Sequence, residues 1–352
     1  MGESDDIGAN GKLLRKTNIL LGIIALAAIG FVMYLAQSVL IPFVIAILLS
    51  VTMVPLYHWL RKHYVPSPLA FIITVCFFDL VALGLAYLLY LNIHSFVENA
   101  PQYKPRIDGL LKSAETWAAG YDIDLSVLKL DDFIGSDTIL GFARTTAASV
   151  AKFVSSAFLV LLFQVFIMLE ATSLRDKIKK NFTSKEAIIN TYDAISGQIR
   201  KYFVAKTLIS LATGAITTIA LWILGVDYPV LWGLVTFMLN YIPSIGSIIA
   251  TLLAGGMAAV QYGITYALLV IAILVVIEFV IGNIIEPRVM GKSLNLSPLV
   301  ILLALVAWSF LWGPVGAVLA VPMMVFVKAV FSNIDTLKPF AKLMESVSKS
   351  EE

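Results

Sequence analysis

The sequence predicts an all-α integral membrane protein, and three features of its composition support this fold class. The chain is 59% hydrophobic and only 14% charged, with a mean hydropathy of +0.91, which is too apolar for a soluble domain. Residues 228–277 contain no Asp, Glu, Lys or Arg, and residues 293–327 form a second charge-free run. Pro and Gly interrupt both runs. The pattern predicts six full spans plus two inverted re-entrant hairpins, an extracytoplasmic helical insert and a cytoplasmic amphipathic helix.

The N-terminal part of the chain is predicted to contain a tail and three transmembrane helices. Residues 1–18 are mostly polar and form a cytoplasmic tail. Within residues 19–91, the apolar runs cover 19–35, 39–60 and 69–91. Each run is of the length expected for a membrane helix. Asp79 lies in the middle of the third run, and an acid at that depth is costly unless it is paired or hydrated, so it is a functional candidate.

Residues 92–152 form the one sizeable polar insert, which is predicted to be extracytoplasmic. Its apolar residues fall on one helical face: Tyr103, Ile107, Leu110, Leu111, Ala114 and Trp117. The run Asp122 to Ser126 suggests calcium, but Val127 and Phe133 occupy the positions where an EF-hand has Gly and Glu. We therefore predict no metal site in the insert. Residues 153–170 follow as the fourth transmembrane helix.

Residues 171–206 form a basic segment with a helical apolar stripe. The stripe consists of Ile188, Tyr192, Ile195, Ile199 and Tyr202. Basic residues beside such a stripe are typical of a helix that lies on a membrane surface. We expect this cytoplasmic amphipathic helix to lead into the fifth span, 207–224.

Residues 207–331 are predicted to form a transport core of two similar units. Each unit has one span, 207–224 or 264–285, followed by a broken apolar segment. The first limbs of the broken segments, 229–241 and 298–311, reach only roughly 20 Å at helical rise, against about 30 Å of hydrocarbon. They are therefore expected to turn back as re-entrant hairpins, with two ordinary kinked spans as the alternative.

The distribution of positive charge predicts the orientation. Six of the 25 Lys and Arg residues lie in the 92–152 insert, and the others lie in segments on the opposite side of the predicted spans. The positive-inside rule then places both termini, including the C-terminus at 332–352, in the cytoplasm. The two units, joined by a polar elbow at 286–292, would enter from opposite sides. Inverted repeats with broken helices are typical of secondary transporters.

The candidate residues of the substrate and ion pathway are of two kinds. Some are Pro and Gly residues at the turns of the hairpins, and the others are polar, charged or aromatic residues in or near the broken segments and spans. The candidates are Asn240, Pro243, Ser244, Gly246, Glu278, Asn283, Glu286, Arg288, Trp308, Gly313, Pro314, Gly316 and Asp79. Asn240 is a strong ligand candidate because its amide both donates and accepts hydrogen bonds. Two members also have a structural interpretation: Glu286 pairs with Arg288 or Lys292 to stabilise the elbow, and Trp308, like Trp312, packs or sits at a membrane interface.

Three motifs resemble the autoinducer-2 exporter family. They are Ile242-Pro243-Ser244-Ile245-Gly246, the stretch from Asn283 to Lys292 with Leu296-Ser297-Pro298 after it, and the stretch from Leu311 to Pro322. The resemblance implies a multi-pass bacterial or archaeal inner-membrane protein that moves small solutes by alternating access. It also implies a homo-oligomer, with a pentamer as the family expectation. Members of this family are linked to autoinducer-2 export or resemble sodium or lithium/proton antiporters.

These features predict a secondary transporter or permease that exports a small polar solute such as autoinducer-2. One alternative is a monovalent cation (Na⁺/Li⁺)/proton antiporter that uses Glu278 and Asp79. Another is a non-transporting scaffold that binds a partner through residues 92–152. The sequence contains no Walker motif, nucleophile elbow or zinc-ligand cluster, so neither an enzyme nor a cofactor is predicted. The expected partners are the solute, the lipid bilayer and a coupling proton or sodium ion, without nucleic acid.

Overall fold

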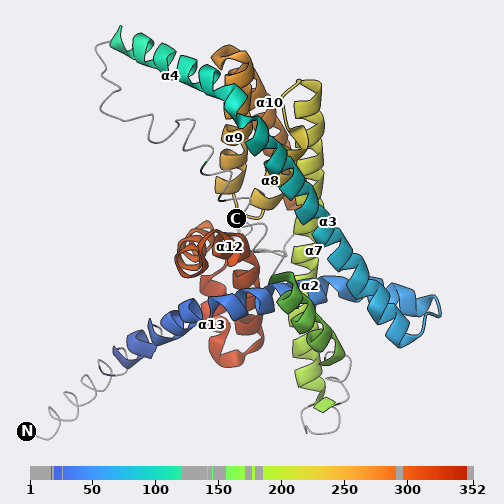
Figure 1. The fold of residues 1–352 in the computed structure, drawn as a ribbon. Coiled ribbons are helices and arrows are strands. Elements are labelled where there is room, and N and C mark those ends of the chain that lie inside the picture. The colour runs from blue at the N-terminus through green and yellow to red at the C-terminus, as the bar shows by residue number, and fades with distance from the viewer. Residues whose placement is uncertain are drawn as a thin grey trace, which may run out of the picture.

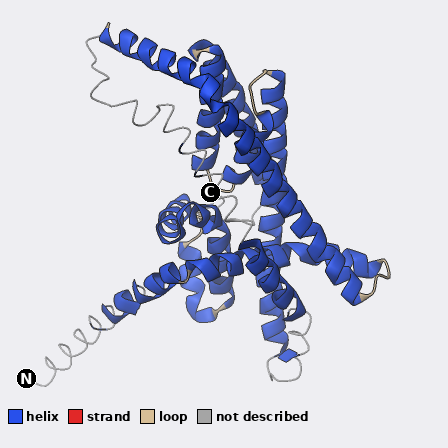
Figure 2. Cartoon of the chain, in the orientation of Figure 1, coloured by secondary structure: helices blue, strands red, loops and turns tan. Residues whose placement is uncertain are grey.

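A computed structural model of the chain describes residues 17, 20–25, 27–120, 141, 145, 156–170, 177–178, 185–290 and 296–346. Within these residues the secondary structure is helical throughout and includes no strand (Figure 2). The predicted all-α class is confirmed. Much of the predicted insert, including the calcium-like run, lies outside the described residues.

Six helices in the described ranges are long and apolar enough to cross a membrane: Gln37–Lys62, Ser67–Leu110, Ile188–Ile223, Ile245–Tyr262, Ile264–Met290 and Pro298–Asn333. They support a multi-pass membrane protein. Four of them cover predicted spans, whereas two belong to the predicted hairpins. The predicted first and fourth spans are the shorter apolar helices Leu20–Leu35 and Ser156–Glu170. The six crossing-length helices are therefore not the same six segments that the sequence predicts.

The N-terminal helices run on into the predicted insert. Helix α2 covers Gln37–Lys62 and α3 covers Ser67–Asn99, followed by the short η1 (Ala100–Tyr103) and α4 (Lys104–Ala119). Tyr103 and Ile107 are buried in a hydrophobic cluster with residues of the helices that follow α7. The start of the amphipathic stripe of the insert therefore packs against the rest of the chain.

Helix α7 runs without interruption over Lys185–Ile223, 39 residues. The sequence suggests a division at Lys206 between a surface helix and a span, but the structure has one helix there. The reason is that Lys206, whose charge marks the expected boundary, is buried and paired within the fold. Helix α7 contacts α2, α8, α10, α11 and α12. Figure 1 shows it running past α8 and α10 and also past α12.

The first broken segment forms α8 (Pro229–Leu239) and α9 (Ile245–Tyr262), with the interruption at residues 240–244 where the sequence predicts it. With 11 residues, α8 is roughly 16 Å long. The 18 residues of α9 extend roughly 27 Å, which is close to a full crossing. The break is therefore observed, and re-entry into the membrane remains a prediction.

The next helix is longer than predicted. Helix α10 (Ile264–Val280) continues through one π-helical turn, η3 (Ile281–Ile285), into α11 (Glu286–Met290). The elbow expected from Glu286 onward is therefore helical as far as Met290, and Lys292 lies outside the described residues. A proline cannot donate the usual backbone hydrogen bond, and the wider π turn accommodates Pro287 without ending the helix.

The second broken segment is α12 (Pro298–Asn333), whose only non-helical residue is Gly313, with φ 63° and ψ −146°. This backbone conformation favours glycine and bends the helix within the predicted turn. The chain ends with η5 (Asp335–Leu337) and α13 (Lys338–Leu343), which packs back on α12 (Figure 1).

Candidate functional site: the polar face of α7

One face of α7 carries polar side chains inside an otherwise apolar helix. The face consists of Tyr202, Lys206, Ser210, Thr213 and Thr217, and all five are buried. Their spacing of three or four residues places them on one side of the helix. Below, the polar face of α7 means these five residues. Buried polar groups in a membrane helix are costly unless they are paired, and they often mark a solute or ion pathway.

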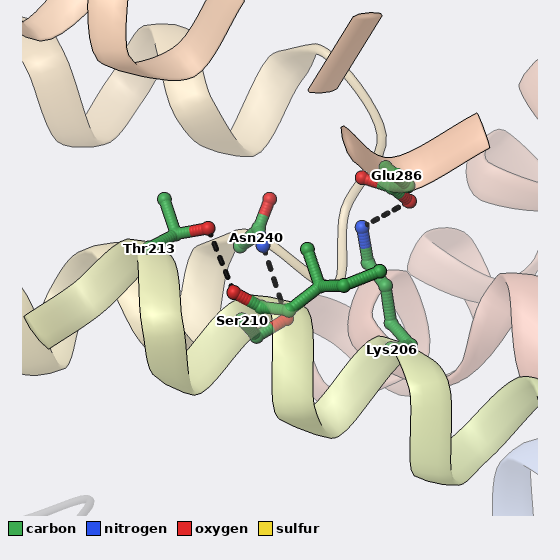
Figure 3. A network of polar contacts seen from close by, with 6 residues as sticks. Lys206, Ser210, Thr213, Asn240 and Glu286 are labelled. Atoms are coloured by element: carbon green, nitrogen blue, oxygen red, sulfur yellow. Dashed lines mark hydrogen bonds and ion pairs between the residues drawn. The ribbon is translucent and has the colours of Figure 1, made fainter. Parts of the chain in front are cut away.

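The turn between α8 and α9 covers the middle of this face. Asn240 ends α8 and donates a hydrogen bond from Nδ2 to Oγ of Ser210 at 3.1 Å (Figure 3). Thr236, one turn earlier on α8, is also buried. The predicted ligand residue Asn240 therefore contacts the polar face directly, while its own side chain is almost completely shielded.

A second contact joins the same turn to α7. The hydroxyl groups of Tyr241 and Thr207 lie 2.8 Å apart. Because Thr207 already donates to the carbonyl oxygen of Phe203, Tyr241 is the donor in this pair. Two hydrogen bonds, from consecutive residues, thus attach the α8–α9 turn to α7.

An ion pair closes the other end of the polar face. Nζ of Lys206 lies 2.7 Å from Oε1 of Glu286 on α11, and the two side chains are only 5% and 21% exposed (Figure 3). Among the described residues the partner of Glu286 is therefore Lys206, whereas Arg288 is exposed and Lys292 lies outside the described residues. Neighbours along the chain, the only partners considered from the sequence, did not include Lys206.

Glu278 and Tyr202 extend this charged cluster. Glu278 is half-buried, and its charge interacts with those of Lys206 and Glu286. Tyr202 is almost fully buried and lies close enough to Glu286 and Tyr241 for electrostatic interaction. Two carboxylates therefore face one buried lysine, which leaves the cluster with a formal charge of −1 when all three groups are ionised.

In each broken segment, a glycine allows the second limb to lie close to the end of the first limb. A Cβ atom at Gly246 would collide with the carbonyl oxygen of Leu239, and one at Gly316 would collide with that of Trp308. In each case the second limb starts against the last turn of the first. The two breaks thus share one local construction, in which only glycine leaves room for the adjacent backbone.

A family model described as AI-2E family transporter matches residues 23–335, which include the whole polar face, both breaks and Glu286. The chain belongs to the AI-2E transporter family. It is 32% identical to the AI-2 transport protein TqsA of Escherichia coli K12, over 95% of this chain and 96% of that protein. A putative transport protein of Borreliella burgdorferi is also 32% identical, over 87% of this chain and 84% of its own length.

The relatives of this AI-2E family member are transport proteins. Among them, the putative transport protein YhhT of Escherichia coli K12 is 27% identical over 87% of this chain and 88% of its own. Together with the six apolar helices, these bacterial relatives support a multi-pass transport protein of the bacterial inner membrane.

Only some of the predicted pathway residues of this family member meet at the polar face. Asn240, Glu278 and Glu286 do, and Gly246 supports the turn that carries Asn240. The side chains of Ser244, Asn283 and Arg288 are exposed, as is Pro314, and Pro243 is half-buried in the turn. Gly313 and Gly316 belong to the break in α12.

Two further groups of predicted residues lie elsewhere. Nε1 of Trp312 donates to the carbonyl oxygen of Met33 at 3.1 Å, and its ring centroid lies 4.8 Å from that of Trp308. This is the packing role expected of membrane aromatics. Asp79 on α3 lies one turn from Val75, which belongs to a hydrophobic cluster with α2, whereas Glu278 interacts with Lys206 and Glu286.

Sequence reasoning missed Lys206, Ser210, Thr213 and Thr217. The signal was present, because these residues recur at intervals of three or four from Tyr202 onward. From the sequence, Tyr202 belongs to an apolar stripe and Lys206 to the basic segment of the surface helix, so the predicted boundary at 206/207 divides the face in two.

Proposed function

We propose that this AI-2E family member is a secondary transporter that exports a small polar solute such as autoinducer-2, and that the solute passes along the polar face of α7. The observation that carries the proposal is the Asn240–Ser210 hydrogen bond between a broken segment and that face. It joins the α8–α9 turn to a row of hydroxyl groups inside an apolar helix.

The chemistry of the face supports a polyhydroxylated solute. Ser210, Thr213, Thr217 and Asn240 supply hydroxyl and amide groups that both donate and accept hydrogen bonds. A sugar-like molecule loses many hydrogen bonds to water when it enters the membrane, and such groups replace them. The printed name of the Escherichia coli relative, an AI-2 transport protein, supports the same class of solute.

A solute would reach the face only after one of the covering segments moves. The α8–α9 turn covers the face through Asn240 and Tyr241, and α11 covers it through Glu286. In the proposed cycle the turn and α11 separate from α7 alternately, so that the face opens to one side of the membrane at a time. Inverted re-entrant hairpins, cytoplasmic termini and a homo-oligomer, a pentamer by family resemblance, are parts of this proposal.

Transport by purified protein in proteoliposomes tests the proposal. Autoinducer-2 flux should fall by about tenfold or more in Asn240→Ala and Ser210→Ala, since each removes a buried hydrogen-bonding group from the proposed pathway. The matched controls are Asn92→Ala and Ser113→Ala, because those side chains are exposed and bond only within their own helices. Equal flux in all four variants would contradict the proposed pathway.

One observation favours the antiporter as the second candidate. Glu278 and Glu286 face a single buried lysine, and a carboxylate in such a cluster is able to exchange a cation for a proton. The antiporter predicts that sodium or lithium pulses drive proton movement in vesicles, and that Glu278→Gln abolishes this response. A response without any autoinducer-2 flux would replace the first candidate with the second.

A further inference from the structure

Three buried side-chain oxygen atoms lack a hydrogen-bond partner in the described part of the chain: Oγ of Ser50, Oδ2 of Asp79 and Oε1 of Gln164. They come from three different helices, α2, α3 and Ser156–Glu170. Buried polar atoms in native proteins are nearly always paired with protein, water or an ion. Three unpaired oxygen atoms therefore indicate a shared ligand if they lie at the same height along the three packed helices.

The hydrophobic contacts between the three helices establish that height. Met53 of α2, Val75 of α3 and Met168 of Ser156–Glu170 pack in one cluster. Ser50 precedes Met53 by three residues, Asp79 follows Val75 by four, and Gln164 precedes Met168 by four. Each oxygen-bearing residue is thus one helical turn from the cluster, on the same face of its helix as the cluster residue.

The directions of the helices place these three turns on the same side of the cluster. A short loop joins α2 to α3, and α3 runs back across α2 at an angle (Figure 1). The ring of Phe163 lies 5.4 Å from that of Phe43, and Nε2 of the adjacent Gln164 contacts Sδ of Met53 at 3.0 Å, so this part of Ser156–Glu170 lies against the stretch of α2 that contains Ser50. Because the chain reverses direction between α2 and α3, moving back along α2 from Met53 corresponds to moving forward along α3 from Val75.

The side chains also point inward. Ser50 and Gln164 are buried, at 4% and 0% exposure, and Nε2 of Gln164 contacts Sδ of Met53 at 3.0 Å. On α3, Phe77 and Leu80 are exposed at 53% and 69%, whereas Asp79 shares the buried face with Val75. Oδ2 of Asp79 is therefore buried on the side of α3 that carries Val75.

We propose that Ser50, Asp79 and Gln164 form a binding site for one sodium ion. A carboxylate, an amide carbonyl and a hydroxyl are hard oxygen ligands, the class that alkali and alkaline-earth cations prefer. Asp79 has no ion-pair partner in the described residues, and one monovalent cation neutralises its charge in an apolar setting. A divalent cation would leave an uncompensated positive charge there.

This site is independent of the proposed transport pathway. It lies on α2, α3 and Ser156–Glu170, whereas the polar face belongs to α7 and is covered by α8 and α11. The sodium site is therefore tested by binding, so that its failure is distinguishable from a failure of solute transport.

The first measurement is the binding of radioactive sodium to the full chain in detergent. The second is thermal unfolding of the same protein in sodium chloride and in N-methylglucamine chloride, at equal ionic strength and pH. Wild type should bind sodium saturably, and its Tm should rise with sodium and then level off, because the ion binds only the folded state. Asp79→Asn should lose both effects. Ser50→Ala and Gln164→Leu should weaken sodium affinity by about tenfold or more.

Two controls match the chemistry of the site. Thr74→Ala removes a buried hydroxyl from α3 that already donates to the carbonyl oxygen of Ala70 at 2.7 Å. Glu98→Gln removes an exposed carboxyl from the same helix, α3, outside both the polar face and the proposed sodium site. Both should keep the sodium response of wild type. Three results would each overturn the proposal: no sodium binding by wild type, an equal rise in Tm with N-methylglucamine, or an unchanged sodium response in Asp79→Asn. The wild-type measurements test the proposal even if the variants fail to fold.

Discussion

Nζ of Lys206 lies 2.7 Å from Oε1 of Glu286, and this ion pair joins α7 to α11 across 80 positions of the sequence. Both side chains are largely removed from solvent. The pair neutralises a lysine that would otherwise be buried without a counter-charge, and it allows α7 to continue as one helix through that position. The same contact closes one end of the polar face.

The first prediction concerns this ion pair. Lys206→Met and Glu286→Leu should each lower the free energy of unfolding by about 3–5 kcal/mol, because each leaves one buried charge unpaired. The double variant should recover most of the loss, since both buried charges of the pair are then absent. Thermal unfolding of the four proteins gives the coupling energy of the pair.

The matched control for that cycle is the exposed ion pair Lys338–Asp335, whose atoms lie 2.6 Å apart with side chains 55% and 94% exposed. Lys338→Met and Asp335→Asn should have almost no effect on unfolding, because water screens this pair. Equal losses of unfolding free energy at the two pairs would show that the burial of Lys206 and Glu286 does not determine how much their ion pair contributes to stability.

The second prediction concerns the construction of the first break. Gly246→Ala should destabilise the protein and reduce transport, because the new methyl group would collide with the carbonyl oxygen of Leu239. Gly256 lies in the same helix, α9, and a methyl group there meets no atom within 4 Å. Gly256→Ala should therefore keep or raise the Tm, since alanine favours helix by about 1 kcal/mol. An equal loss of Tm in Gly246→Ala and Gly256→Ala would contradict this prediction.

The third prediction tests whether the two turns lie within the membrane. Single cysteines at Ser244→Cys and Val315→Cys, in a Cys76→Ser background, should react with small thiol reagents but only slowly with large maleimides. The reason is that a turn at membrane depth is reached only through a narrow aqueous path. Ser113→Cys and Lys338→Cys provide fully accessible references. Rapid reaction of both turns with large maleimides would place them at the water boundary and favour kinked spans.

The fourth prediction concerns the docking of the C-terminal helix. Met344 is 8% exposed and packs with Leu296 and Met290, and its carbonyl oxygen accepts a hydrogen bond from the backbone N–H of Ser297 at 2.8 Å. Met344→Asp should lower the Tm markedly, because it buries an unpaired carboxylate. The adjacent Leu343 is 76% exposed, so Leu343→Asp should leave the Tm close to that of wild type. A similar Tm for both variants would argue against docking of α13.

Local sequence signals predicted the breaks because their causes are local. The interruption at residues 240–244 contains Pro243 and is followed by Gly246 in the first turn of α9, and Gly313 with Pro314 bends the second segment. Both interruptions lie where the charge-free runs suggest them. Apolar length likewise identified helices that are able to cross a membrane. The motifs around these breaks also identified the family.

The composition of the chain and its Pro and Gly positions thus determined an all-helical membrane protein of this family with two interrupted segments. The tertiary structure alone decided that Lys206 pairs with Glu286 and that Asn240 bonds to Ser210, at separations of 80 and 30 positions. It also decided that α7 is one helix. Helical periodicity specifies which residues share a face, whereas the element that covers the face depends on how the helices pack, which no local pattern specifies.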